Sequence, residues 1–373
     1  MKPRLYLDHN ASSPARPEVI TAMVAALNTP GNASTPHGAG RAASKLVSDG
    51  REAVGLAMGV CAQDIVFMGS GTEAINTAIK SVVDNGTKRM LVSGMDHPAA
   101  IVAAEASGAK VDIIPTLSTG QMDLDWLAQT LADWDADDGA PFLTMSAANS
   151  ETGVLQDVEK AADLVHAVKG YILVDAVQSL GKMPMLFIVD YLAVSAHKIG
   201  GPQGVGALYV SPDAPYSSLI IGGGQEKRRR AGTINVAGIA GFGAAAKIAE
   251  NLSHTRAIRD AIEKGLKALE PHITIFGEGA ERLPNTSLFA VPDVSSSTLM
   301  MGLDLEGISV STGLACSSGK VGASRAVTAM GLADKAPHGA IRLSLGYTSQ
   351  PEDAARFLNA WTKIRKIAIR GAA

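Results

Sequence analysis

A lysine that directly follows an apolar run is the residue best suited to covalent chemistry in this sequence. Residues 195–202 read Ser-Ala-His-Lys-Ile-Gly-Gly-Pro, so Lys198 stands at the end of a strand-like run and before a glycine-rich turn. An amine at the carboxyl end of a strand can form a Schiff base with a carbonyl cofactor, and Ser195 and His197 can hydrogen-bond a phosphate. Considered alone, the block also fits a surface lysine in a loop.

A carboxylate ends the preceding apolar run. Residues 171–174 are followed by Asp175 and, three positions later, by Gln178. A buried carboxylate needs a charged or multiply hydrogen-bonded partner, and a protonated pyridine nitrogen is such a partner. Asp175 would keep that ring an electron sink, and Gln178 could donate to its phenolate oxygen. An aspartate that caps a loop is the alternative, which Lys198 one strand later makes the weaker interpretation.

Polar residues follow three further apolar runs. Gly71 and Thr72 open a predicted helix, so backbone N–H groups and the Thr72 hydroxyl can hold a phosphate at its positive end, although a threonine at a helix N-terminus is commonplace. His97 could stack on a pyridine ring and move protons, or be a solvated loop histidine. Asn149 places an amide near the same rim, or belongs to a polar turn.

Alternating strands and helices must position these side chains. Apolar runs predict strands at residues 64–68, 89–92, 111–114, 142–146, 171–174, 191–195 and 207–210, and amphipathic segments predict helices at 72–83, 99–107 and 124–134. This alternation indicates an α/β fold with a mostly parallel sheet covered on both faces. Ligands of such sheets bind at the carboxyl ends of the strands.

The length of 373 residues favours two domains. We expect a large domain over residues 15–253 and a smaller α+β C-terminal domain over 254–373, on which residues 1–14 pack. After residues 222–224 a helical stretch is expected to reach residue 269. Strands at 286–291 and 341–345 and helices at 297–305 and 351–364 are expected beyond it. The Gly/Ala-rich segment 231–249 contains Thr233, Asn235 and Lys247, which favours a buried helix over a membrane span.

Composition narrows the function classes. A hydrophobic content of 46% with 18% charged residues is typical of a compact protein, and a net charge of −3 gives no basic face for nucleic acid. Two cysteines in no zinc or disulfide pattern fit a reducing compartment. The N-terminus lacks the apolar run of a signal peptide, so we expect the cytoplasm and no membrane. The eight histidines show no HExxH pairing, and no metal is expected.

Together these motifs resemble the class V, fold-type I enzymes that use pyridoxal 5'-phosphate (PLP), and among them the NifS/IscS-type cysteine desulfurases. The resemblance runs along nearly the whole chain. Two departures are Ser70, where the family usually has glycine, and His9, where asparagine is common. The matching segments are residues 6–11, 31–37, 72–73, 97–98, 149–153, 175–179, 195–198, 222–226, 232–233, 315–319 and 341–342.

The resemblance implies a role for each matching residue near the cofactor. Lys198 would form the Schiff base, His97 would stack on the ring, Asp175 would pair with its nitrogen and Gln178 with its phenolate oxygen. The phosphate would be held by Thr233 of the other subunit, which implies a homodimer, and by a group in the same chain: Gly71, Thr72, Ser195 and His197.

Two further residues point to the substrate. Arg342 matches the family's clamp for a substrate carboxylate, which a guanidinium fork suits, and Asn149 would assist it. Cys316 lies in a Gly/Ser-rich segment and matches the nucleophile that takes sulfur from L-cysteine as a persulfide, leaving L-alanine. The sulfur would pass to an acceptor protein of iron–sulfur cluster assembly or tRNA thiolation. By contrast, Cys61 is expected in an apolar core.

Three alternatives remain open at this point. A selenocysteine lyase, or another class V PLP aminotransferase, would share Lys198, Asp175 and Arg342, although an aminotransferase needs no nucleophilic Cys316. A catalytically idle scaffold protein of the same fold should have lost the lysine or the aspartate, and both are present.

Overall fold

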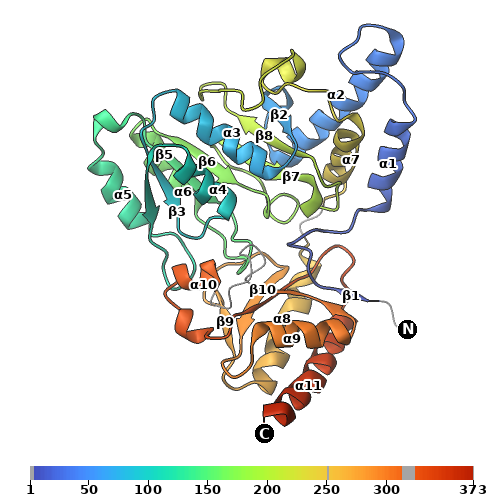
Figure 1. Cartoon of the computed structure of the whole chain (residues 1–373), viewed down its shortest axis with the longest axis vertical. Coiled ribbons are helices and arrows are strands. Elements are labelled where there is room, and N and C mark those ends of the chain that lie inside the picture. Colours follow the sequence, from blue (N-terminus) through green and yellow to red (C-terminus); the bar gives the residue numbers. More distant parts are fainter. Residues whose placement is uncertain (1–3, 250–251, 313–323, 373) are drawn as a thin grey trace.

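The computed structural model describes residues 4–249, 252–312 and 324–372. Within these ranges the chain forms two α/β parts, one above the other in Figure 1, each with its own sheet. Cys316 lies outside the described residues. No described helix has both the length and the apolar character needed to cross a membrane.

A seven-stranded sheet forms the centre of the large part, in the order β2-β8-β7-β6-β5-β3-β4. Only β8 runs antiparallel to its neighbours, so the expected mostly parallel sheet is confirmed. The strands are β2 (Ile65–Met68), β3 (Arg89–Ser93), β4 (Lys110–Ile114), β5 (Phe142–Ser146), β6 (Tyr171–Asp175), β7 (Tyr191–Ser195) and β8 (Gly206–Val210).

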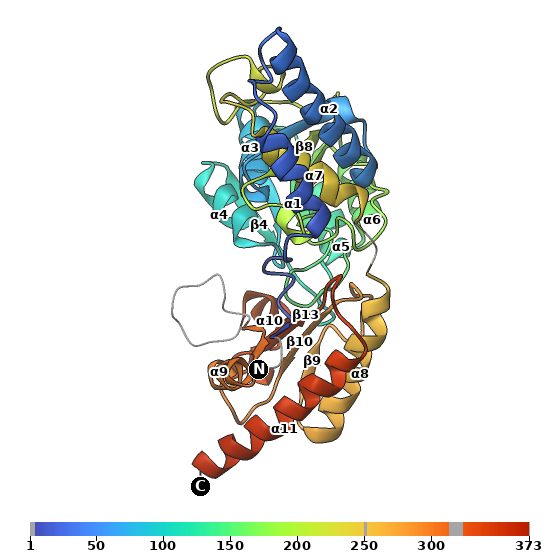
Figure 2. The same ribbon diagram turned by 90° about the vertical axis from the view of Figure 1, so that its right-hand side faces the viewer.

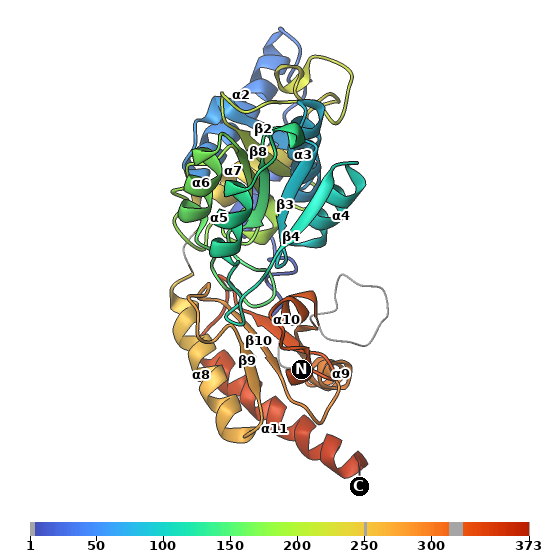
Figure 3. The same ribbon diagram turned by 90° about the vertical axis from the view of Figure 1, so that its left-hand side faces the viewer.

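Successive residues of these strands pack into two separate cores, one on each face of the sheet. Val92 packs with α3 (Gly71–Asp84) and α4 (Pro98–Ala106), whereas Leu91 packs on the opposite face. Because both faces are covered, the strands read as continuous apolar runs. The opposite face carries α2 (Gly38–Met58), α5 (Leu124–Ala132), α6 (Val158–Ala167) and α7 (Val236–Lys247), as Figure 3 shows.

Glycines explain how α7 packs so closely against α2. A Cβ on Gly243 would lie 2.6 Å from the Cα of Gly50, so the two backbones touch at this point. The Gly/Ala-rich segment is therefore a buried helix, as expected, and α1 (Pro17–Leu27) packs beside it. The helices α1, α2 and α6 were not predicted from the sequence. The helical stretch expected to reach residue 269 consists of two helices, since α7 ends at Lys247 and α8 begins at His254.

A four-stranded antiparallel sheet, in the order β12-β13-β10-β9, forms the small part. Helices α8, α9 and α11 share one apolar core on one face of this sheet, and α10 packs on the other face (Figure 2). The short N-terminal strand β1 (Leu5–Tyr6) pairs with β11 (Ile308–Ser309) of this part. The remaining elements are α8 (His254–Leu269), β9 (Thr274–Phe276), β10 (Thr286–Ala290), α9 (Ser296–Leu305), β12 (Ser311–Thr312), α10 (Arg325–Ala329), β13 (Ile341–Ser344) and α11 (Glu352–Ala372).

Two features support the proposed division into residues 15–253 and 254–373. Helix α8 begins at residue 254, and each sheet has its own apolar core. Strand β1 pairs with β11 of the small part, whereas the Ser13 N–H donates to the His197 carbonyl oxygen of the large part, so the expectation that residues 1–14 pack on the small part stays a prediction. The first residues after β1 then lead back to the large part, so this segment spans both parts (Figure 1).

Candidate active site

A cavity of about 380 Å³ opens where β6 and β7 end. This is the edge of a parallel sheet at which ligands bind. The small part contributes Arg342 to its wall, so both parts form the cavity. Of the expected site residues, the cavity is lined by Gly71, Thr72, His97, Asp175, Gln178, Ser195, His197, Lys198 and Arg342.

Lys198 lies in the cavity on a short 3-10 helix, η3 (Ala196–Lys198), that directly follows β7. A glycine turn allows this geometry: Gly200 has φ +81°, and a Cβ on Gly201 would lie 2.8 Å from the Ala196 carbonyl oxygen. The Lys198 Nζ donates to the backbone carbonyl oxygens of Asn10 at 2.6 Å and Ala11 at 3.0 Å. The amine is therefore positioned by the N-terminal segment.

Asp175 is the last residue of β6, and its side chain is buried beside the cavity. Its Oδ1 accepts a hydrogen bond from the Val177 N–H at 2.9 Å. Burial raises the pKa of this carboxyl group, while the charges of His97 and Lys198 oppose the rise. A cationic group bound in the cavity would favour the ionised carboxylate in the same way.

His97 caps the N-terminus of α4 and lines the cavity. Its Nδ1 accepts a hydrogen bond from the Ala99 N–H at 3.1 Å, so in the neutral ring the proton is on Nε2. Burial lowers the pKa of His97, and the nearby Asp175 acts in the opposite direction. The ring is thus available as a proton carrier whose donor atom is fixed by the helix cap.

Three elements meet to form a cradle suited to phosphate. Ser70, rather than Thr72, caps α3, with its Oγ accepting from the Glu73 N–H at 3.1 Å. The Thr72 hydroxyl remains exposed at the cavity wall. A Cβ on Gly71 would lie 2.7 Å from Val177 Cγ2, so glycine is needed where α3 meets the chain after β6. The side chains of Ser195 and His197 complete the cradle.

His197 is held neutral by its surroundings. Burial lowers its pKa to about 4, and the positive charges of Lys198 and Lys182 act in the same direction. The His197 Nδ1 lies 3.3 Å from the Ser12 Oγ. A neutral imidazole can donate one hydrogen bond to an anion without adding a second buried charge.

Arg342 reaches the cavity from β13 of the small part. Its Nη2 forms an ion pair with Asp8 Oδ1 at 3.0 Å, and its Nη1 donates to the Ser150 carbonyl oxygen at 3.2 Å. The Nε atom is buried with no hydrogen-bond partner among the described residues. A guanidinium with N–H groups left over is suited to a carboxylate ligand.

Asn149 is close to the cavity but does not line it. Its Oδ1 accepts from the backbone N–H groups of Glu151 and Thr152 at 2.9 and 2.8 Å, and its Nδ2 donates to the Met95 carbonyl oxygen at 2.9 Å. These contacts shape the turn that carries Ser150, on which Arg342 rests. They favour an indirect part in binding over the direct contact expected from the sequence.

Three other expectations have different outcomes. Thr233 is exposed and lies outside the cavity of its own chain, so its expected role toward the other subunit stays a prediction. Cys316, the expected nucleophile, belongs to the segment that the structure leaves undescribed. The prediction that Cys61 is buried is wrong: it is exposed, because it precedes the surface 3-10 helix η1 (Ala62–Asp64).

Sequence reasoning missed three buried residues around the site. Asn10 accepts hydrogen bonds from Lys198 and Gln178 through its backbone carbonyl oxygen. Asp96 accepts from the Ser146 N–H at 2.6 Å, and burial raises the pKa of Asp96 to about 7. Lys182 lies beneath Gln178. The sequence offered one signal for these residues, which is that Gln178 and Lys182 are four positions apart.

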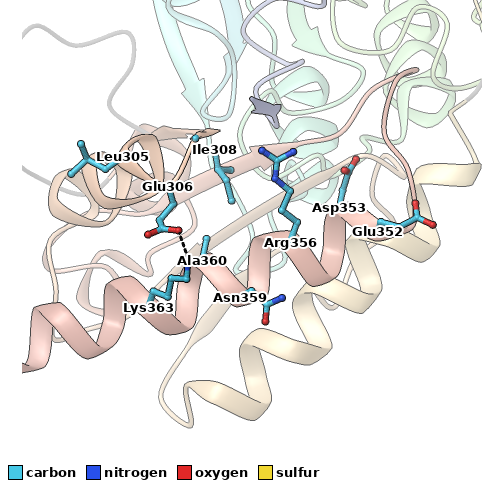
Figure 4. A pocket seen from close by; sticks show the side chains of 10 residues that line it. Leu305, Glu306, Ile308, Glu352, Asp353, Arg356, Asn359, Ala360 and Lys363 are labelled. Atoms are coloured by element: carbon cyan, nitrogen blue, oxygen red, sulfur yellow. Dashed lines mark hydrogen bonds and ion pairs between the residues drawn. The ribbon is translucent and has the colours of Figure 1, made fainter. Parts of the chain in front are cut away.

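A second hollow, of about 670 Å³, lies on the small part between the end of α9 and α11. Figure 4 shows its charged lining, which includes an ion pair between Lys363 and Glu306 at 2.8 Å. None of its lining residues belongs to the constellation around Lys198. Its size alone therefore does not make it a catalytic site.

Comparison with protein families gives one match that spans most of the chain. Residues 5–357 match the family described as Aminotransferase class-V. The chain belongs to the class-V aminotransferase family.

Relatives within this family are cysteine desulfurases. A cysteine desulfurase of Cereibacter sphaeroides is 37% identical over 368 residues, which cover 95% of this chain and 94% of that protein. The cysteine desulfurase IscS of Dictyoglomus turgidum is 33% identical and covers 98% of this chain and 95% of its own. A solved structure of a NifS-like protein matches with a TM-score of 0.89, at 32% identity, covering 98% of this chain and 100% of that one.

These matches confirm the resemblance to NifS/IscS-type cysteine desulfurases and the expected fold. Class-V aminotransferases generally depend on PLP, and the residues of the cavity fit that cofactor. Asp175 offers a buried carboxylate for a protonated ring nitrogen, and Lys198 offers the amine. The glycine at position 71 keeps open a cradle that a Cβ would narrow.

Proposed function

We propose that this protein is a PLP-dependent cysteine desulfurase that converts L-cysteine to L-alanine and takes the sulfur onto Cys316 as a persulfide. The observation that carries the proposal is that Lys198, Asp175 and Arg342 line one cavity. An amine, a buried carboxylate and a guanidinium are the groups that a PLP enzyme acting on an amino acid requires. The cysteine desulfurase relatives supply the reaction class.

When bound, the cofactor supplies an electron sink for the negative charge that develops at the substrate Cα. Asp175 would hold the proton on the ring nitrogen, and Gln178 would donate its amide N–H to the phenolate oxygen. His97 would pack against the ring. The phosphate would be bound by Gly71, Thr72, Ser195 and His197, and by Thr233 of a second subunit in the proposed homodimer.

The chain's own residues then act on the substrate in order. Arg342 binds the carboxylate of L-cysteine, and the Lys198 amine removes the Cα proton. The Cys316 thiolate attacks the substrate sulfur, so an S–S bond forms and the substrate C–S bond breaks. His97 or Lys198 then delivers a proton to Cβ, in place of the proton that the substrate thiol loses, and Lys198 returns a proton to Cα, which gives L-alanine. The net change moves one sulfur atom from the substrate to Cys316.

The persulfide on Cys316 then passes its sulfur to an acceptor protein. The resemblance to NifS/IscS-type enzymes suggests the proposed acceptor class, which is an iron–sulfur scaffold or a tRNA-thiolation protein. Two cysteines without a disulfide pattern and a reactive thiol fit a reducing compartment, so the cytoplasm is the proposed location.

The two cysteines of the chain provide a matched test. In Cys316→Ser, we expect the loaded enzyme to keep its visible absorbance but to lose alanine formation from L-cysteine by roughly 100-fold or more, as for removal of a nucleophile. Cys61→Ser should behave as wild type, because Cys61 is exposed and not among the residues lining the cavity. The assay measures alanine and protein-bound sulfane sulfur.

Full alanine formation by Cys316→Ser would show that this thiol is not the sulfur acceptor. A class V aminotransferase or a selenocysteine lyase would then be the better interpretation. Comparing L-cysteine, L-selenocysteine and a keto-acid acceptor on the same preparation distinguishes these two from the proposed activity.

A further inference from the structure

A second lysine lies buried beneath the cavity. Lys182 follows β6 and has only 3% of its surface exposed. Its Nζ donates to Gln178 Oε1 at 2.9 Å and to Asn10 Oδ1 at 3.0 Å. Among the ion pairs of the described residues, none includes Lys182, and both acceptors are neutral amides. Burial lowers the pKa of Lys182 well below its usual value, and the charges of Lys198 and Arg342 act in the same direction.

The contacts of the Lys182 amine fix the orientation of Gln178. The Lys182 Nζ donates to Gln178 Oε1, so the amide turns its oxygen toward Lys182. Its Nε2 then points the other way, where it donates to the Asn10 carbonyl oxygen at 3.0 Å beside the cavity. Without Lys182, Gln178 Oε1 would lose its donor, and only the contact with the Asn10 carbonyl oxygen would hold the amide.

Lys182 orients a second amide in the same way. Asn10 Oδ1 accepts from Lys182 and from Asn285 Nδ2 at 3.1 Å, so Asn10 Nδ2 faces Thr286 Oγ1 at 2.9 Å. The backbone carbonyl oxygen of Asn10 in turn accepts from Lys198 Nζ. Lys182 is thus linked to Lys198 through Asn10, and to the cavity through Gln178.

We propose that Lys182 is a positioning residue that holds the Gln178 amide with its N–H toward the phenolate oxygen of PLP. This inference rests on the proposed function, because it assigns a residue to the same cofactor site. It adds a residue that touches neither the phosphate cradle nor the substrate clamp Arg342. The sheet-end lysine Lys198 and the buried lysine Lys182 then have different tasks.

The proposal predicts a spectroscopic effect. A hydrogen bond stabilises an anionic oxygen, so it favours the deprotonated form of the loaded chromophore. Loss of a hydrogen bond to a charged group corresponds to roughly one to two pH units. In Lys182→Met, the pH midpoint of the visible absorbance change should therefore rise by about that amount. Retention of PLP on dilution should weaken roughly tenfold or more.

Two further variants test the orientation of the amide. Gln178→Glu keeps Lys182 but supplies only acceptor atoms, so its midpoint should also rise. Lys182→Gln retains an N–H donor for Gln178 Oε1, and its midpoint should lie between those of Lys182→Met and wild type. Lys45→Met is the matched control, because Lys45 is an exposed lysine on α2 paired with Asp49, and it should leave the midpoint unchanged.

The measurement is a pH titration of visible absorbance on full-length protein loaded with PLP, with folding checked by circular dichroism. A folded Lys182→Met with the wild-type midpoint and wild-type PLP retention would overturn the proposal. If Lys182→Met does not fold, the same criterion applies to Lys182→Gln. Wild-type protein that develops no visible band with PLP would instead overturn the proposed function, and this inference with it.

Discussion

Individual residues around the cavity owe their properties to burial. Lys198, Asp175 and His97 could be predicted from the sequence because each directly follows an apolar run, and the carboxyl ends of parallel strands meet at one edge. Asn10 and Lys182 could not be predicted, since their importance depends on contacts between segments about 170 residues apart in the chain. The sequence also could not indicate that the Asn149 side chain is already engaged by its own turn.

His9 leads to a prediction about the pH dependence of folding. It is 1% exposed, its Nε2 has no hydrogen-bond partner among the described residues, and burial lowers its pKa to about 4. In the unfolded chain His9 takes up a proton near pH 6.5, whereas in the folded chain it does so only near pH 4. The contribution of His9 to the free energy of unfolding therefore falls as the pH drops through this window.

The measurement compares wild type with His9→Asn by urea unfolding between pH 7.5 and about pH 4. The wild type should lose up to about 3 kcal/mol relative to the variant over that window. The difference between the two proteins removes the contributions of other titrating groups, such as Asp96, which titrates in the opposite sense. Parallel profiles for the two proteins would contradict the prediction.

At the scale of elements, the ends of strands and helices form the walls of the cavity. The strands of the large sheet were predicted within one or two residues, because their apolar runs are buried on both faces. Helix α2 was not predicted, because glycines such as Gly50 interrupt the buried apolar face formed by Val47, Val54 and Met58. The residues between α7 and α8 include no glycine or proline that would mark the end of a helix. Such features depend on packing between elements, which a single sequence does not reveal.

Gly206 on β8 tests how closely the phosphate cradle is packed. A Cβ there would lie 2.7 Å from both the Ser70 carbonyl carbon and the Val194 carbonyl oxygen, and 3.0 Å from the Gly71 nitrogen. Gly206→Ala should therefore push the turn before α3 out of place, at a cost of about 1–3 kcal/mol in unfolding free energy. PLP affinity, measured by equilibrium dialysis, should fall roughly tenfold.

Gly279→Ala is the control for this variant, because nothing lies within 4 Å of a Cβ at that position in the small part. It should bind PLP as tightly as wild type does. Unchanged affinity in a folded Gly206→Ala would show that the turn at Ser70 and Gly71 is not a tight part of the cofactor site.

At the scale of the whole molecule, the site combines groups from both parts of the chain. Lys198 comes from the large part and Arg342 from the small part, and the segment before Pro14 joins them through Asn10 and Asp8. The sequence predicted two domains, but the bridging role of the N-terminal segment follows only from its contacts. In the proposed dimer, Thr233 of a second chain would complete the phosphate site.

Mixed dimers test whether two chains share a site. Lys198→Ala and Thr233→Val should each have low activity, the latter because loss of a hydrogen bond to a charged group weakens PLP binding tenfold or more. If sites are shared, one site of each mixed dimer combines an intact Lys198 with an intact Thr233. Mixing the two variants under conditions that exchange subunits should then restore activity. A monomer in sedimentation analysis, or no restoration on mixing, would contradict shared sites.

The central claim is that one amine of this chain, that of Lys198, carries PLP. Borohydride reduction of the loaded protein fixes the pyridoxyl group on that amine, and peptide mass spectrometry locates it. Lys198 should carry the label, and the buried Lys182 should remain unmodified, because its Nζ is engaged by two amides away from the main cavity. Label on Lys182, on another lysine or on none would contradict the account.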